Sequence, residues 1–220
     1  MSETAETPAA IRPSFYNLIA GHDLGRIAAL SDGIFGVAMT LLFLDVRLPE
    51  APEISSEQAL IAALGALAPK FLTWLLSAMT VGIFWLGQAT QLDNLERSDR
   101  NLCWLHFAFL AVVTALPFST RLLADFFTYR TAFAIYWANI MLCGATLYVC
   151  WAYSERAGLA KRPYTPELGN AMRKRIVYAQ TLYGIGMLIG LISPPFGVLV
   201  IIAIQLNYAL GLKLPARFAH

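Results

Sequence analysis

The sequence has 220 residues, of which 58% are hydrophobic and only 14% are charged, with a formal net charge of +2. Soluble globular domains carry about 25% charged residues, so this chain has little more than half the usual share. The charges that it has are clustered, and long apolar stretches separate them. About 20 consecutive apolar residues are needed for a helix to cross a bilayer core of about 30 Å. The composition excludes a soluble globular protein and predicts an integral membrane protein.

The N-terminal segment MSETAETPAA is acidic and polar, and it lacks the basic and apolar regions of a signal peptide. We therefore expect residues 1–22 to form a flexible cytoplasmic tail. The three cysteines lie in apolar segments without CxxC or Cys/His spacing, so neither a disulfide framework nor a zinc site is predicted.

The first apolar segment lies between Arg26 and Asp45, and Asp32 is the only charged residue inside it. The second extends from residue 58 to residue 91 with Lys70 as its only charge, and a proline interrupts it just before that lysine. Because the second segment is longer than one span requires, we expect a span near 70–90. The preceding residues, 58–69, are then expected to form a re-entrant or interfacial piece.

Further along the chain, charge gaps predict a third and a fourth span, and a basic loop over residues 154–175 follows them. The remaining uncharged stretch is broken by Ser193-Pro194-Pro195, which divides it into two spans because consecutive prolines stop a helix. The sequence thus predicts an all-α membrane domain over residues 23–215. Its six transmembrane helices are expected at about 26–45, 70–90, 102–121, 131–153, 176–193 and 195–212.

The distribution of lysine and arginine predicts the orientation in the membrane. If the N-terminus is inside, twelve of these residues lie on the inside and only three, Arg47, Arg121 and Arg130, on the outside. Cytoplasmic loops carry an excess of positive residues, so both termini are expected in the cytoplasm, with an even number of spans. We expect a multi-pass protein of the cell membrane.

Enzyme signatures are absent from the sequence, which has no HExxH, GxSxG, Walker or GxGxxG motif. No catalytic residue, metal site, cofactor or nucleic-acid partner is therefore predicted. An arginine series typical of a voltage sensor is also absent, as is the potassium-filter sequence TVGYG. What remains is a set of polar groups inside the apolar segments: Ser31, Asp32, Thr40, Lys70, Ser77, Gln88 and His106.

The first segment separates these candidates by helix face. At 100° per residue, Val37, Leu41 and Leu44 share one side with Thr40 nearby, whereas Asp32 points to the opposite side. Both sides are largely apolar, so periodicity leaves two interpretations of the apolar stripe open, namely helix packing and an ion path. For Asp32, a paired structural carboxylate and a functional one remain equally possible.

The segment RIAALSDGIFGVAMTLLFLDV resembles the signature of the transmembrane protein 175 family, the potassium channels of lysosomes and prokaryotes. The residues that fit in register are Arg26, Ser31, Asp32, Gly33, Thr40, Leu41 and Leu42. The similarity continues to about residue 120, through Pro69-Lys70, Trp85 and Pro117-Phe118. Two positions differ from the family pattern: Leu30 stands where Phe is usual, and Gln88 where His is expected.

The resemblance implies a homotetramer of six-span subunits with a central pore lined by the first helix, and the bilayer as the other partner. It places the hydrophobic pore constriction at Val37, Leu41 and Leu44, with Thr40 as a polar residue lining the pore. Arg26, Ser31 and Asp32 would form a structural polar network. The implied function is a potassium-permeable, leak-type channel, in which K⁺ is the permeant ion and no cofactor is needed.

Two other functions remain open from the sequence. A proton- or ion-coupled transporter would use Asp32, Lys70 and His106 as a relay, although the chain shows no internal repeat of the kind common in transporters. A structural membrane protein is the third possibility, in which the apolar stripe would only pack against other helices.

Overall fold

The computed structural model describes residues 21–47, 54–161 and 165–209. Most of the predicted N-terminal tail, and the last residues of the predicted domain, lie outside these ranges. The described residues are helical apart from short connections and one isolated β-bridge, between Leu95 and Ala160. The helices are α2 (Leu24–Leu44), α3 (Glu57–Ala66), α4 (Ala68–Asp93), α5 (Arg100–Thr114), α6 (Leu116–Asp125), α7 (Arg130–Arg156), α8 (Pro166–Ile192) and α9 (Pro194–Ala209).

Side-chain caps explain where several of these helices begin. The Asp23 carboxylate accepts a hydrogen bond from the Arg26 amide at 3.2 Å, and Asp99 accepts one from the Leu102 amide at 2.8 Å. Thr165 caps α8 in the same way, and proline follows it at the first helical position. These residues satisfy backbone N–H groups that have no partner inside the helix.

Prolines divide two of the long apolar stretches. α5 and α6 together form one candidate span, Arg100–Asp125, which is interrupted at Ala115 just before Pro117. Leu67 separates α3 from α4 in the same manner, before Pro69. Proline inside a helix lacks an N–H donor and clashes with the preceding turn, so the helix restarts at the proline.

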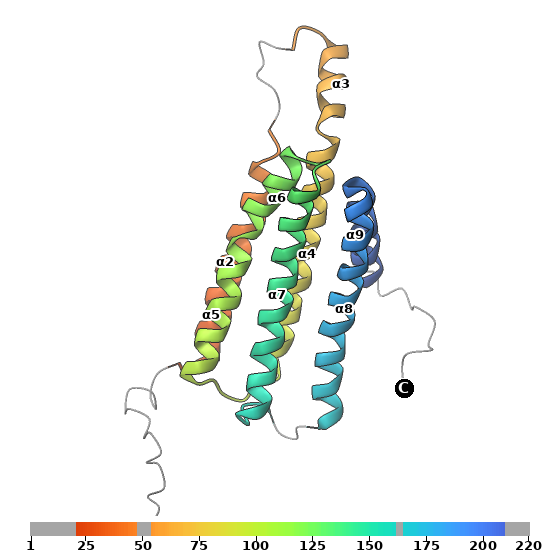
Figure 1. Ribbon diagram of the computed structural model, residues 1–220. Coiled ribbons are helices and arrows are strands. Elements are labelled where there is room, and N and C mark those ends of the chain that lie inside the picture. The colour runs from red at the N-terminus through yellow and green to blue at the C-terminus, as the bar shows by residue number, and fades with distance from the viewer. Residues whose placement is uncertain (1–20, 48–53, 162–164, 210–220) are drawn as a thin grey trace, which may run out of the picture.

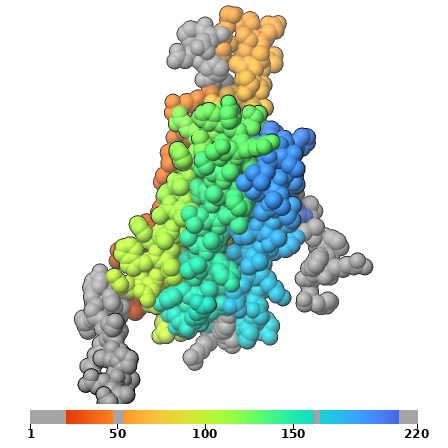
Figure 2. Space-filling view, in the orientation of Figure 1, coloured from red at the N-terminus to blue at the C-terminus, as the bar shows by residue number. Residues whose placement is uncertain are grey.

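Helix α3 covers most of the piece that precedes the predicted second span. Residues 58–69 were predicted to be re-entrant or interfacial, but α3 buries no residue and projects beyond one end of the bundle (Figure 1). Figure 2 shows it standing clear of the packed body, while α7, α8 and α9 lie side by side. Within the subunit, α3 thus does not fold back among the helices, and a re-entrant or interfacial position in the membrane stays a prediction.

The basic segment that precedes the fifth predicted span is also helical. α8 begins at Pro166, so Arg173, Lys174 and Arg175 lie within the helix rather than in a loop. The structure contains five helical segments long and apolar enough to cross a membrane, and α9 is a shorter apolar helix of 16 residues within the described range.

Contacts between the connections define two ends of the bundle. At one end, the His22 ring bonds to the Ser98 carbonyl at 3.1 Å, and the Glu96 amide donates to the Leu159 carbonyl at 2.9 Å. At the other end, Arg121 lies 3.6 Å from Asp45, joining α6 to the end of α2. The loops that the charge count assigns to the inside lie at the first of these two ends.

Candidate ion path and polar contacts

Helix α2 buries only one narrow stripe of its surface. Ile27, Ser31, Phe35, Ala38 and Leu42 face the rest of the subunit at helical spacing. In contrast, the predicted constriction residues are exposed, with 59% of Val37, 45% of Leu41 and 62% of Leu44 accessible. Three large apolar side chains along one helix thus have no cover within the subunit.

This uncovered side of α2, called the open face below, borders a groove. Val37, Leu41 and Gly33 line it from α2, and Thr114 and Pro117 line it at the break between α5 and α6. The groove has a volume of about 380 Å³. Thr40 is exposed on the same helix and donates its hydroxyl to the Val37 carbonyl at 2.8 Å. Because that bond uses only the hydrogen, the Thr40 oxygen keeps lone pairs free for an ion or water.

Asp32 lies on the other flank of α2. Its carboxylate accepts a hydrogen bond from the Trp85 indole of α4 at 2.8 Å, and both side chains are exposed. The buried stripe separates Asp32 from the open face, so a single copy of α2 does not direct both toward one passage. Trp85 is a partner that reasoning from the helical faces of α2 alone did not find, because it comes from another helix.

The three residues of the predicted polar network make separate contacts. Ser31 is buried and donates its hydroxyl to the Ile27 carbonyl at 2.7 Å, whereas Arg26 is exposed. No bond joins Arg26, Ser31 and Asp32 within the described part of this one subunit. A network among them stays a prediction for the assembled protein.

Asp32, Lys70 and His106, the candidate relay of the transporter hypothesis, each have a different partner. The Lys70 amine lies 3.9 Å from Asp125, and the buried His106 ring bonds to Gln88 at 3.1 Å. Asp32 bonds to Trp85, as described above. No chain of hydrogen bonds connects the three groups among the residues that the structure describes. Gln88, one of the departures from the family pattern, is thus the partner of His106 on α5.

A cluster of hydroxyl groups in the interior was not predicted as a unit. Ser77 contacts Thr120 at 2.7 Å and donates to Tyr136 at 3.1 Å. Thr80 also contacts Tyr136, at 3.1 Å, and accepts a bond from the Gln205 amide at 2.7 Å. The members come from α4, α6, α7 and α9, so only the three-residue spacing of Ser77 and Thr80 was visible in the sequence. Over the described ranges, no group of three or more His, Cys, Asp or Glu side chains could hold a metal ion.

Comparison with known proteins identifies the family. Residues 26–117 match the family model described as endosomal/lysosomal potassium channel TMEM175. A potassium channel of Streptomyces collinus is 30% identical over 174 residues, covering 77% of this chain and 82% of that protein. The chain belongs to the TMEM175 family. The matched region contains α2 to α5, and with them the open face and the Asp32–Trp85 and Gln88–His106 contacts.

Two further relatives extend the comparison. The crystal structure of a lysosomal potassium-selective channel TMEM175 homolog from Chamaesiphon minutus superposes with a TM-score of 0.73 at 25% identity. That match covers 86% of this chain and 97% of the other. The mouse protein named endosomal/lysosomal proton channel TMEM175 is 32% identical over 118 residues, but this chain covers only 24% of its length.

Proposed function

We propose that this protein is a potassium channel whose pore is lined by the open face of α2. The observation that carries the proposal is the row of exposed apolar side chains, Val37, Leu41 and Leu44, along one side of α2. The similarity to proteins named potassium channels over most of the chain supports it.

The proposed assembly is a homotetramer of six-span subunits. α9 would belong to the sixth span, and an even number of spans agrees with the predicted cytoplasmic position of both termini. Four copies of α2 around an axis would place Val37, Leu41 and Leu44 in rings. Asp32 with Trp85, together with Ser31 and Arg26, would hold α2 in place from its other sides. The expected location is the cell membrane.

A ring of apolar side chains gates ions by excluding water from a narrow passage. Such a ring offers no oxygen to replace the hydration shell of an ion, so the ion must pass with most of its water or lose part of it. Thr40 would supply the nearest hydroxyl. In this mechanism, the preference for potassium follows from its weaker hydration and from contact with the Thr40 oxygen.

Flux measurements in liposomes test the function. Purified protein is reconstituted, and potassium and sodium flux are compared under the same gradient. We expect potassium flux to exceed sodium flux. Val37→Ala, Leu41→Ala and Leu44→Ala should each raise the flux severalfold, since each widens the constriction.

Leu188→Ala is the matched control, because Leu188 is equally exposed but lies on α8. Its flux should equal that of the original protein. If the folded protein conducts neither ion, or if the three α2 variants and the control behave alike, the proposed pore is refuted. A native mass of about four times the 24.2 kDa subunit in detergent tests the tetramer separately.

The same liposomes distinguish the channel from the transporter. A channel predicts flux that rises with the gradient and survives Asp32→Asn in correctly folded protein. A coupled transporter predicts potassium movement that depends on a proton gradient and is lost in Asp32→Asn.

A further inference from the structure

Arg175 is a charged residue of α8 that contacts an aromatic side chain. Its Nε donates to the Tyr208 hydroxyl, and its guanidinium carbon lies 5.0 Å from the centre of the Tyr208 ring. Two residues earlier, Arg173 pairs with Glu155 at 3.0 Å. Among the described residues, no carboxylate comes within ion-pair distance of Arg175. A cation within a membrane span is costly unless a counter-charge or polar group accompanies it.

An open apolar groove begins beside this arginine, between α4 and α9. Arg175 and Tyr208 border it, and its walls are Met79, Gly82, Ile83 and Leu86. Its volume is about 490 Å³. A Cβ atom added to Gly82 would meet nothing within 4 Å, so the missing side chain leaves this wall open.

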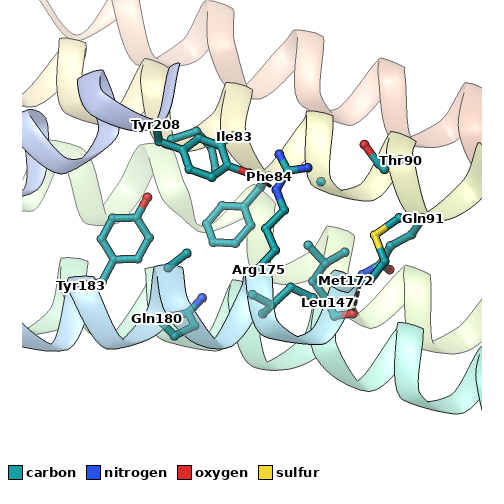
Figure 3. Close-up of a pocket in the computed structure, with 13 residues that line it drawn as sticks. Ile83, Phe84, Thr90, Gln91, Leu147, Met172, Arg175, Gln180, Tyr183 and Tyr208 are labelled. Carbon is teal, nitrogen blue, oxygen red and sulfur yellow. Dashed lines mark hydrogen bonds between the residues drawn. The ribbon is translucent and has the colours of Figure 1, made fainter. Parts of the chain in front are cut away.

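A smaller, mostly apolar cavity with a few polar side chains adjoins the other side of Arg175. It lies between α4, α7 and α8, has a volume of about 50 Å³, and is lined by Gln91 and Gln180 together with Arg175 (Figure 3). Gln91 is buried, and its side-chain oxygen has no hydrogen-bond partner. The Gln180 side-chain oxygen is likewise buried and unpaired. Both oxygens are hydrogen-bond acceptors, so each can receive a bond from a donor group that enters the cavity.

The order of these features along the bundle matches the structure of a phospholipid. Arg175 follows two further basic residues, near the end of α8 that the charge count assigns to the cytoplasm. Along α4, the groove extends from Leu86 to Met79. At 1.5 Å per residue, Met79 lies about 10 Å further than Leu86 from the predicted cytoplasmic end of the bundle. A cation and a set of apolar walls thus border one groove.

We propose that this groove binds an anionic phospholipid of the inner leaflet. The phosphate would pair with Arg175, a hydroxyl-bearing headgroup would donate to the oxygen of Gln91, and an acyl chain would lie along Gly82 and Leu86. Basic pockets between helices on the cytoplasmic side suit this class of ligand. The site is separate from the open face of α2, so the proposal does not depend on the pore.

Native mass spectrometry of the purified full chain, titrated with phosphatidylglycerol or phosphatidylcholine, tests the proposal. The original protein should retain phosphatidylglycerol in preference to phosphatidylcholine. Arg175→Gln should weaken phosphatidylglycerol binding roughly tenfold, the effect of losing one charge-assisted hydrogen bond. Lys174→Gln is the matched control, since it removes one positive charge from an exposed neighbour that does not line the groove.

Gly82→Leu provides an independent test because it fills the groove and leaves Arg175 in place. It should also weaken phosphatidylglycerol retention, whereas Gly184→Leu, at another open helical glycine that lies outside the groove, should not. The proposal is overturned if Arg175→Gln and Gly82→Leu both bind phosphatidylglycerol like the original protein, or if phosphatidylcholine binds equally well. It is also overturned if the groove variants change the oligomeric state instead of lipid binding, because the groove is then a contact between copies.

Discussion

Glycines serve opposite purposes in two regions of this subunit. Where α8 and α9 meet, a Cβ atom on Gly197 would lie 2.6 Å from the Gly190 Cα, so the two backbones are too close for any side chain. On α2, a Cβ atom on Gly33 or Gly36 would meet nothing within 4 Å. The first pair allows helices to touch, as small residues do at membrane helix contacts. The second pair keeps a helix surface smooth and uncovered. The α8–α9 contact is therefore closely packed, whereas the exposed surface of α2 is not packed against its own subunit.

Gly197→Ala is expected to change stability more than any other variant that tests this difference between the two regions. The added methyl group clashes with backbone, which cannot move away as a side chain can, so the variant should lose about 1–3 kcal/mol of stability. Thermal unfolding of the detergent-solubilised protein measures this loss. Gly36→Ala is the matched control and should be neutral or stabilising by up to about 1 kcal/mol, since alanine favours the helix. Equal destabilisation by both variants would remove the distinction between the two regions.

A smaller loss of stability is expected when single hydroxyl groups are removed from the interior and from the open face of α2. Tyr136→Phe removes the shared partner of Ser77 and Thr80 in the interior and should cost about 1 kcal/mol, the scale of hydrogen bonds between membrane helices. Thr40→Val removes only a bond to the helix's own backbone on the open face, so stability should change by less than about 0.5 kcal/mol. Unfolding curves of both variants, recorded side by side, test this order. A Thr40→Val loss as large as that of Tyr136→Phe would contradict it.

The smallest change in stability is expected from the ion pair between Arg121 and Asp45, which joins α6 to the end of α2. Arg121→Gln breaks the ion pairs with Asp45 at 3.6 Å and Asp125 at 3.7 Å, but the arginine side chain is 65% exposed. Exposed pairs contribute about 0–1 kcal/mol and are screened by salt. The melting temperature should therefore fall slightly at low ionic strength and not at all in concentrated salt. A large loss that persists in salt would show that this contact, rather than the buried stripe, holds α2.

The membrane class, the all-α fold and the family were accessible from the sequence because they depend on local properties. Apolar length between charges predicts a span wherever it occurs, and the Ser-Asp-Gly signature needs only adjacent residues. Helix boundaries were less accessible. The predicted fifth span begins at residue 176, whereas the helix that contains it, α8, begins at Pro166. Low hydropathy over residues 166–175 hides this first part of the helix from a search for apolar spans.

Partners between helices were decided only by the tertiary structure. Asp32 was recognised as unusual from its position in α2, but its bond to Trp85 depends on how α4 packs beside α2. The hydroxyl cluster and the Arg175–Tyr208 contact likewise join residues far apart in the chain. The sequence alone determined which helix faces are apolar, because that follows from a period of 3.6 residues. Which apolar face is buried and which stays open was decided by packing, because both kinds of face contain the same residue types.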